Sequence, residues 1–187
     1  LELRTGLGAA MIRWGLDTTL RSWEPERVLS LLGEATREIP REAPLEASAP
    51  PSLVAVVLAG NVFTAAMRAL LLPIAAGVPV LAKASSADDV LPRYLAKALN
   101  AADADVGRSL EVVTFSHGDA ALETALLDHA EVVSIHGSDS TIEAWKARVP
   151  TGVRVLAHGH GLGVAYVARA ALQDGDGAER VAAQVAL

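Results

Sequence analysis

The sequence predicts an α/β fold, in which helices cover both faces of a parallel β-sheet and a helical N-terminal segment comes first. After residue 52, short apolar runs alternate with longer helical patterns. The apolar runs are continuous rather than alternating, which is typical of strands buried on both faces. A chain of 187 residues that is 51% hydrophobic can also bury a sizeable core. Strands that alternate with helices pair through right-handed crossovers, so the sheet is expected to be parallel.

Residues 1–52 are predicted to form a helical lead-in and a linker. Apolar side chains recur at helical spacing over residues 7–23. A second helical pattern over residues 24–39 opens with Pro25, a residue favoured in the first turn of a helix. Residues 40–51 are rich in proline and alanine, which indicates an extended linker.

Residues 53–187 are predicted to supply the sheet and its covering helices. The expected strands are 53–59, 78–83, 110–115, 131–136 and 153–157, with 163–168 as a candidate sixth, and the expected helices are 62–76, 86–103, 119–130, 137–149 and 177–187. Ligands of such sheets bind beyond the carboxyl ends of the strands. The segments to inspect are therefore 60–61, 83–86, 116–119, 136–139 and 158–163.

Composition and charge exclude several classes of protein. The net charge of -6 argues against a nucleic-acid partner, which requires clustered Lys and Arg. The chain has no cysteine, so it contains no disulfide, zinc–thiolate site or cysteine nucleophile. Residues 53–82 carry only Arg68 as a charge, but glycines and prolines break them into pieces too short to form a membrane span. The first ten residues lack the pattern of a secretory signal, so we expect a cytoplasmic location.

Gly60 and Asn61 follow the first predicted strand, and Asn61 is a polar amide within the most apolar part of the chain. Asparagine is among the best N-cap residues, so Asn61 can be explained as the cap of the next helix. Its amide can equally serve as a donor to a developing oxyanion. Both roles hold together if the helix starts at the site.

Two further strand ends carry candidate ligand-binding residues. Lys83, followed by Ser85 and Ser86, is well placed for a ribose or a phosphate, although most lysines at strand ends are simply solvated. Gly137 and Ser138 open a helix, and such a turn is either an anion site or an ordinary capped turn.

The segment HGHGLG, residues 158–163, is unusual in its alternation of histidine and glycine. Two histidines without a nearby Cys, Asp or Glu make a poor zinc site, so we expect no metal. A backbone bend close to a ligand suits His158 and Gly159 better. His117, Gly118 and Asp119 form either a loop beside a cofactor or a helix cap.

Taken in order, the motifs LAGNV, LAKAS, VSIHGS and VLAHGHGLGVAYV resemble the acyl-CoA reductase family, the LuxC-like branch of the aldehyde dehydrogenase superfamily. The N-terminal TGLGAAMIRWGLDTTLRSW is similar to the helical lead-in of that branch. The resemblance implies that residues 53–187 form a Rossmann-like nucleotide-binding domain. It also implies an acyl-CoA substrate and an NAD(P)H cofactor, and relatives commonly form homo-oligomers.

The same resemblance implies roles for individual residues. Asn61 matches the asparagine of the oxyanion hole, and Lys83 the lysine that binds the adenosine ribose. Ser86 stands where NAD-preferring relatives often carry glutamate, which favours NADPH, with NADH possible, although Asp88 and Asp89 nearby weaken that preference. Gly137 and Ser138 match the turn near the pyrophosphate. His158 falls near the position of a general-base glutamate.

The family's nucleophile is a cysteine, which takes the acyl group as a thioester before hydride transfer gives a thiohemiacetal and then the aldehyde. This chain has no cysteine, so we expect it to be an excerpt of a longer protein that binds cofactor but does not catalyse alone. The alternatives are a non-catalytic nucleotide-binding or scaffold domain, an acyl-phosphate reductase relative, and a membrane-associated protein.

Overall fold

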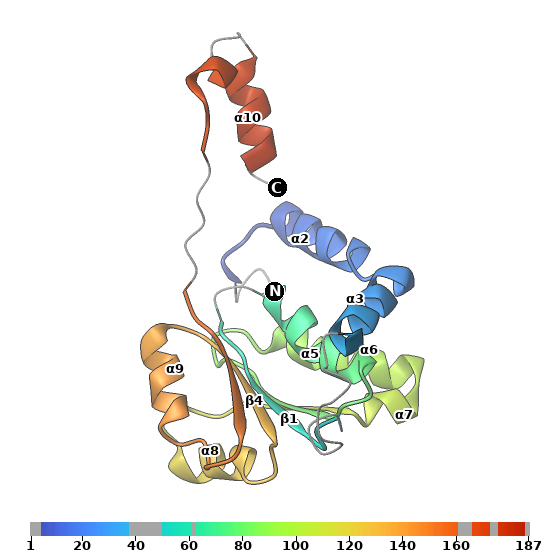
Figure 1. Ribbon diagram of the computed structural model, residues 1–187, viewed down its shortest axis with the longest axis vertical. Helices are drawn as coiled ribbons and strands as arrows, with labels where there is room; N and C mark the ends of the chain where they lie inside the picture. The colour runs from blue at the N-terminus through green and yellow to red at the C-terminus, as the bar shows by residue number, and fades with distance from the viewer. Residues whose placement is uncertain (1–4, 38–49, 61–62, 161–165, 173–175, 186–187) are drawn as a thin grey trace.

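A computed structural model describes residues 5–37, 50–60, 63–160, 166–172 and 176–185 (Figure 1). Its strands are β1 (Val54–Val57), β2 (Val80–Lys83), β3 (Leu110–Val113), β4 (Val132–His136) and β5 (Arg154–His158). Its helices are α2 (Ala9–Arg21), α3 (Pro25–Arg37), α5 (Ala65–Ala75), α6 (Val90–Ala102), α7 (Ala104–Gly107), α8 (Ala120–Leu127), α9 (Asp139–Lys146) and α10 (Gly177–Val185), with a 3-10 turn η1 (Arg169–Leu172).

The strands form one parallel sheet in the order β3-β2-β1-β4-β5, which confirms the predicted α/β fold. From β1 the chain winds outward through β2 to β3, then returns to the other side of β1 for β4 and β5. The strand order therefore reverses between β1 and β4. In Rossmann-like sheets this reversal opens a crevice at the carboxyl ends of the strands.

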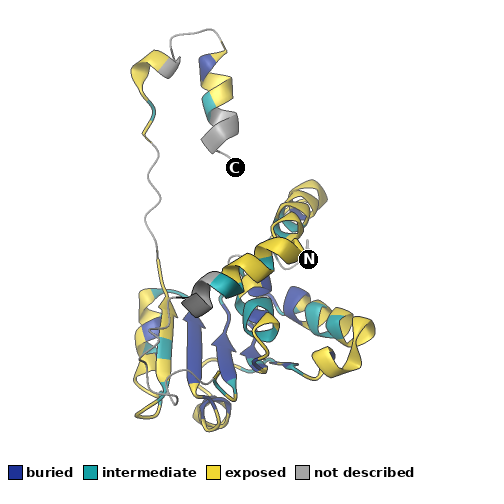
Figure 2. Ribbon diagram, turned by 45° about the vertical axis from the view of Figure 1, so that its right-hand side comes forward, coloured by how far each residue is buried: buried dark blue, intermediate teal, exposed yellow. Residues whose placement is uncertain are grey.

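Successive residues of each strand point to opposite faces, so the core consists of two layers. On one face, Val54 and Val56 of β1 pack with Leu70 of α5 and with residues of α6. On the other face, Ala55 and Val57 pack with Leu127 of α8 and Trp145 of α9. Figure 2 shows the buried strands between these helical layers. Burial on both faces explains why the strands read as continuous apolar runs.

The N-terminal helices pack on the α5 side of the sheet. A β-carbon added at Gly15 of α2 would lie 3.0 Å from the Phe63 ring, so that helix approaches the segment before α5 closely. Trp23, Val28 and Leu31 line a small cavity together with Leu72 of α5. Helices α2 and α3 thus lie beside α5, with a small, partly apolar cavity between them.

Several element boundaries differ from the sequence prediction. Residues 166–168 of the candidate sixth strand form no strand, and 163–165 lie outside the described residues. Helix α6 begins at Val90 rather than residue 86, because the Asp88 carboxylate accepts the Val90 N–H and holds the preceding turn out of the helix. The short helix α7, which was not predicted from the sequence, begins at Ala104, and the side chain of its N-cap Asp103 accepts two backbone N–H groups.

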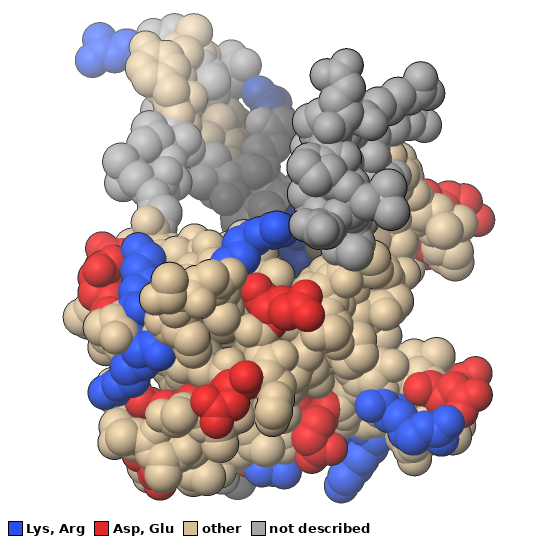
Figure 3. Space-filling view, turned by 60° about the horizontal axis from the view of Figure 1, so that its bottom comes forward, with Lys and Arg blue, Asp and Glu red and all other residues tan. Residues whose placement is uncertain are grey.

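Among the described helices, none combines the length and the apolar character that a bilayer crossing requires. Figure 3 shows acidic and basic side chains interspersed on the face that it presents. Strand β5 is the least buried strand, and its Leu156 is 45% exposed. The described helices therefore cover the centre of the sheet better than its β5 edge.

Candidate functional site

A cavity of about 340 Å³ lies at the carboxyl ends of β1, β2 and β4, where the strand order reverses. Its wall consists of strand ends, the loops that follow them and the first turns of α9. The lining residues are Val57, Leu58, Ala59, Gly60, Lys83, Ser85, Ser86, His117, His136, Gly137, Ser138, Thr141, Trp145 and His160. The volume falls within the range of about 300–1,000 Å³ usual for small-molecule sites. We refer to it as the switch-point cavity.

Lys83 is the one Lys or Arg side chain among the lining residues given above, and burial lowers its pKa. It is the last residue of β2, only 7% exposed, and its Nζ lies 5.0 Å from the centroid of the Phe115 ring. Burial lowers the pKa of the Lys83 ammonium, and the Glu123 carboxylate partly offsets that lowering. An ammonium that lines a cavity with an aromatic face beside it is suited to a polar or anionic ligand.

At two glycines of the cavity lining, Gly60 and Gly137, the backbone lies so close to neighbouring side chains that a β-carbon would crowd them. A β-carbon added at Gly60 would lie 2.5 Å from Ser85 Oγ and 3.1 Å from the Ala87 β-carbon. One added at Gly137 would lie 3.1 Å from Thr141 Cγ2. Any side chain at these positions would therefore push the loops after β1 and β4 away from their neighbours.

Helix α9 points its N-terminus at the cavity. Ser138 is its N-cap, and the Ser138 Oγ accepts the Thr141 N–H at 3.3 Å. Ser138 and Thr141 both line the cavity. The unpaired N–H groups of a helix's first turn carry partial positive charge, which favours an anion there.

His136 and His158 form a stacked pair at the ends of β4 and β5. Their ring centroids are 4.3 Å apart with an angle of 10° between the planes, and the two residues are partners in the parallel register. Burial, and to a lesser extent His158, lowers the pKa of His136 to about 4. His136 is therefore neutral near pH 7, and its Nε2 lies 3.2 Å from Ser134 Oγ.

A second cavity of about 790 Å³ lies on the α5 side of β4 and β5, and both histidines line it. Its remaining wall is mostly apolar, with Arg68 and Arg154 as its cations. His136 thus separates the two cavities, whereas His158 belongs to the second one alone.

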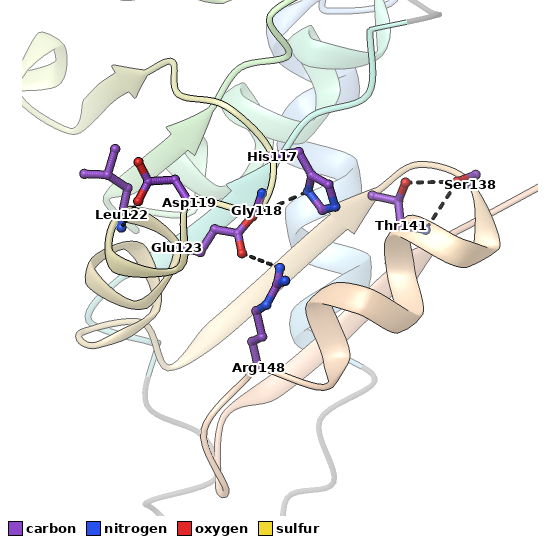
Figure 4. Close-up of polar contacts among 8 residues, drawn as sticks. All are labelled: His117, Gly118, Asp119, Leu122, Glu123, Ser138, Thr141 and Arg148. Carbon is purple, nitrogen blue, oxygen red and sulfur yellow. Dashed lines mark hydrogen bonds and ion pairs between the residues drawn. The ribbon is translucent and has the colours of Figure 1, made fainter.

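The turn after β3 forms another part of the switch-point cavity. His117 lines the cavity, and the adjacent Gly118 has a φ of 89°, a left-handed conformation that favours glycine. The Gly118 N–H donates to Glu123 Oε1 at 2.8 Å (Figure 4). The buried Glu123 also pairs with Arg148.

The cavity brings together six of the residues that the sequence analysis assigned to the cofactor: Gly60, Lys83, Ser85, Ser86, Gly137 and Ser138. Three others do not line it: Gly118 lies behind His117, His158 stacks on His136, and Gly159 packs against α9. A β-carbon added at Gly159 would meet Asp139 Oδ1 at 2.7 Å. Asn61 lies outside the described residues, and the residue that precedes α5 is Thr64.

Four further residues line the cavity without having been predicted to do so: His136, Thr141, Trp145 and His160. Gly137, Thr141 and Trp145 are four residues apart, so the spacing of one helix face could have indicated the last two. His136 and His160 lie in two of the strand-end segments that the sequence singled out, 136–139 and 158–163, but no individual role was predicted for either. Among the described residues, no three His, Asp or Glu side chains converge as metal ligands would.

Comparison with known protein families identifies the family to which the chain belongs. A family model described as Acyl-CoA reductase (LuxC) matches residues 28–187. The chain belongs to the acyl-CoA reductase (LuxC) family. A search of the curated proteins found no significant match. Family membership makes this chain a member of an oxidoreductase family, and it confirms the resemblance inferred from the motifs.

Proposed function

We propose that the switch-point cavity binds the NADPH with which the parent protein reduces an acyl-CoA thioester to an aldehyde. One observation carries the proposal: in a member of the acyl-CoA reductase family, six predicted cofactor-binding residues line a single cavity at the reversal of strand order. When bound, NADPH would supply the hydride. The residues of this chain bind and orient it.

The chemistry of the lining suits a dinucleotide. The Lys83 ammonium and the hydroxyls of Ser85 and Ser86 offer donors to a ribose and its phosphate. Across the cavity, the Gly137 turn and the N-terminus of α9 offer backbone N–H groups to a pyrophosphate. Gly60 and Gly137 let the turns after β1 and β4 approach Ser85 and Thr141 closely, because a β-carbon at either position would crowd those side chains.

The arrangement after β2 favours NADPH over NADH. Ser86 lines the cavity with a small hydroxyl, which leaves room for a 2′-phosphate. The nearby acids have other partners: Asp88 is 5% exposed and accepts the Val90 N–H, and Asp89 forms an ion pair with Arg93 at 2.9 Å. Neither acid lines the cavity, so the like-charge repulsion expected from them is reduced.

The acyl-transfer step needs a thiolate, and this chain has no cysteine. We assign that step to a cysteine elsewhere in the parent protein, whose sulfur displaces CoA thiolate and holds the acyl group as a thioester. Hydride addition then gives a thiohemiacetal, which collapses to the aldehyde and regenerates the thiolate. Asn61 remains our candidate for the amide that stabilises the oxyanion.

Nucleotide titration of the parent protein, paired with an activity assay, tests this function. We expect NADPH to bind at least tenfold more tightly than NADH, and acyl-CoA to be reduced with NADPH. Ser86→Glu places a carboxylate at the proposed phosphate position, so it should weaken NADPH binding at least tenfold and leave NADH binding within about threefold.

Ser116→Glu is the control variant, since it adds the same charge outside the cavity lining. Nucleotide binding without turnover would favour a binding or scaffold role. Turnover of an acyl phosphate but not of acyl-CoA would favour the acyl-phosphate reductase alternative. Absence of nucleotide binding would overturn the proposal.

A further inference from the structure

The second cavity, of about 790 Å³ on the α5 side of the sheet, has no part in the function proposed above. Its floor is one face of β4 and β5, since alternate residues of each strand line it. These residues are Val132, Ser134 and His136 of β4, and Arg154, Leu156 and His158 of β5. Its wall is helix α5. We refer to this cavity as the β4–β5 groove.

The two ends of the β4–β5 groove differ in polarity. At the carboxyl ends of the strands, the His136 and His158 rings stack on each other. Helix α5 connects the parallel neighbours β1 and β2, so it runs opposite to the strands, and Arg68 in its first turn lies toward the same end. The other end is mostly apolar, and its lining includes Pro51, Val54, Leu72, Pro73, Val78 and Val132. A ligand that fits this groove should therefore have one polar end and one apolar end.

The polar end of the groove adjoins the switch-point cavity, because His136 lines both. From His136 the floor extends along β4 to Val132, a span of about 13 Å at the usual rise of a strand. The volume of the groove lies within the range of about 300–1,000 Å³ usual for small-molecule sites. An extended hydrocarbon chain would therefore fit the groove with its polar end beside the proposed nucleotide site.

The charged side chains of the groove are basic. Arg68 and Arg154 line it, and none of the described residues that line it is acidic. In the part of the chain that the structure describes, neither guanidinium forms an ion pair. The carboxylate of Glu131, the residue before β4, accepts the hydroxyl and the N–H of Ser52. Although the net charge of the chain is -6, charge complementarity at the groove therefore favours an anionic head group.

We propose that the β4–β5 groove binds the acyl chain of the acyl-CoA substrate, with the thioester beside His136 and the tail toward Val54 and Val132. The substrates are then long-chain acyl thioesters. This inference rests on the function proposed above, because it names the substrate class of the same site. The phosphates of CoA supply the negative charge that complements Arg68. Arg154 is exposed on β5, the outermost strand, so its guanidinium can stay in water beside the tail.

A helix of the parent protein laid over the groove is the other occupant to test, because parallel sheets are usually covered on both faces. Leu156→Glu separates the two, since it places a carboxylate in the middle of the floor, where an acyl chain would have to bury it. Leu156 is 45% exposed, so the replacement leaves the core of the sheet intact. Leu122→Glu is the matched control, because Leu122 is 46% exposed on α8 and does not line the groove.

Calorimetric titration of the full-length protein with S-alkyl-CoA thioethers, without nucleotide, measures this binding. Thioethers lack the carbonyl that a thiolate attacks, so no acyl transfer accompanies the titration. We expect S-octyl-CoA to bind at least about tenfold more tightly than S-butyl-CoA, because each buried methylene adds to the affinity. Leu156→Glu should weaken S-octyl-CoA binding at least about tenfold and S-butyl-CoA binding by no more than about threefold. Leu122→Glu should change neither.

Arg68→Gln tests the polar end and remains useful if Leu156→Glu does not fold. It removes the cation beside the head group, so it should weaken both thioethers severalfold and by the same factor. Equal affinity for the two thioethers, or unchanged binding of both in Arg68→Gln, would overturn the proposal. So would a Leu156→Glu protein that is less stable but still prefers S-octyl-CoA, because a protein segment would then occupy the groove.

NADPH titrations of the same proteins separate this inference from the proposed function. Leu156 does not line the switch-point cavity, so Leu156→Glu should leave NADPH affinity within about threefold. A chain-length preference that Leu156→Glu abolishes, in a protein that does not bind NADPH, would retain the groove and reject the proposed nucleotide site. NADPH binding without any chain-length preference would do the reverse.

Discussion

At the scale of single residues, the site combines groups whose charge depends strongly on their surroundings. Lys83 and His136 are both bases at strand ends, and burial lowers the pKa of each. For Lys83, a nearby carboxylate opposes the effect, whereas for His136 a second imidazole adds to it. Burial therefore leaves the His136 ring neutral near pH 7, in the same cavity that Lys83 lines.

His136 makes stability depend on pH in the acid range. Its pKa is about 4 in the folded protein and about 6.5 ordinarily, so the unfolded chain binds more protons between these values. Its stabilising contribution is therefore complete above pH 6.5 and lost as the pH falls to 4. We expect a loss of at most about 3 kcal/mol in the free energy of unfolding, less after solvent screening, measured by urea denaturation at a series of pH values.

The comparison of two glutamine variants isolates this contribution. His136→Gln should flatten the dependence of stability on pH between 6.5 and 4. His129→Gln, at an exposed position just after α8, should leave that dependence as it is in the unmodified protein. Equal slopes in the two variants would contradict the assignment to His136.

At the scale of elements, the cavity is lined mainly by residues at and just after the carboxyl ends of the strands. The strands could be predicted because continuous apolar runs mark burial on both faces, and the cofactor candidates because they follow strands. Helix starts were predicted less well. Asp88, Asp89 and the serines before them are all good caps, and their order along the chain does not reveal that Asp88 turns inward.

Some residues of the site escaped sequence reasoning for a physical reason. His160 enters the cavity and His158 does not, although a single glycine separates them. Residue types in an irregular, glycine-rich segment do not specify the direction of each side chain. His136 lines both cavities, whereas His158, its partner in the parallel register, lines only the second. The division of the chain at residue 52 stays a prediction.

The N-cap of α9 should matter for both stability and ligand binding. Ser138→Ala removes the acceptor of the Thr141 N–H, which should lower the free energy of unfolding by about 1 kcal/mol. It should also weaken NADPH binding severalfold, because the first turn of α9 lines the cavity. Calorimetric titration and urea denaturation measure the two effects.

Asp103→Ala provides the matched control for this prediction. Asp103 caps α7 through two backbone N–H groups, and it does not line the cavity. Its loss should cost a comparable amount of stability with no change in the NADPH dissociation constant. If both variants weakened binding equally, the effect would reflect general loosening of the fold.

At the scale of the whole molecule, the sheet separates two apolar layers, and no side chain of the described residues belongs to both. Leu70 of α5 lies in one layer and Leu127 of α8 in the other, and both are almost fully buried. The strands of the sheet lie between the two layers. This arrangement makes the thermodynamics of the core testable.

Truncation in each layer should therefore be additive. We expect Leu70→Ala and Leu127→Ala each to lower the free energy of unfolding by about 2–5 kcal/mol. The double variant, measured by urea denaturation, should lose the sum of the two within about 0.5 kcal/mol. A larger deviation would mean that the sheet transmits packing changes from one face to the other.

The order of the strands has a consequence for how the cavity comes into being during synthesis. A ribosome releases the chain from its N-terminus, so β1, β2 and β3 emerge first and can pair as one half of the sheet. At that stage Gly60 and Lys83 are present, but the wall opposite them is missing. Only when β4 and His160 have followed is the cavity complete. A nascent chain should therefore acquire affinity for the nucleotide late, in one step, after most of its structure has formed.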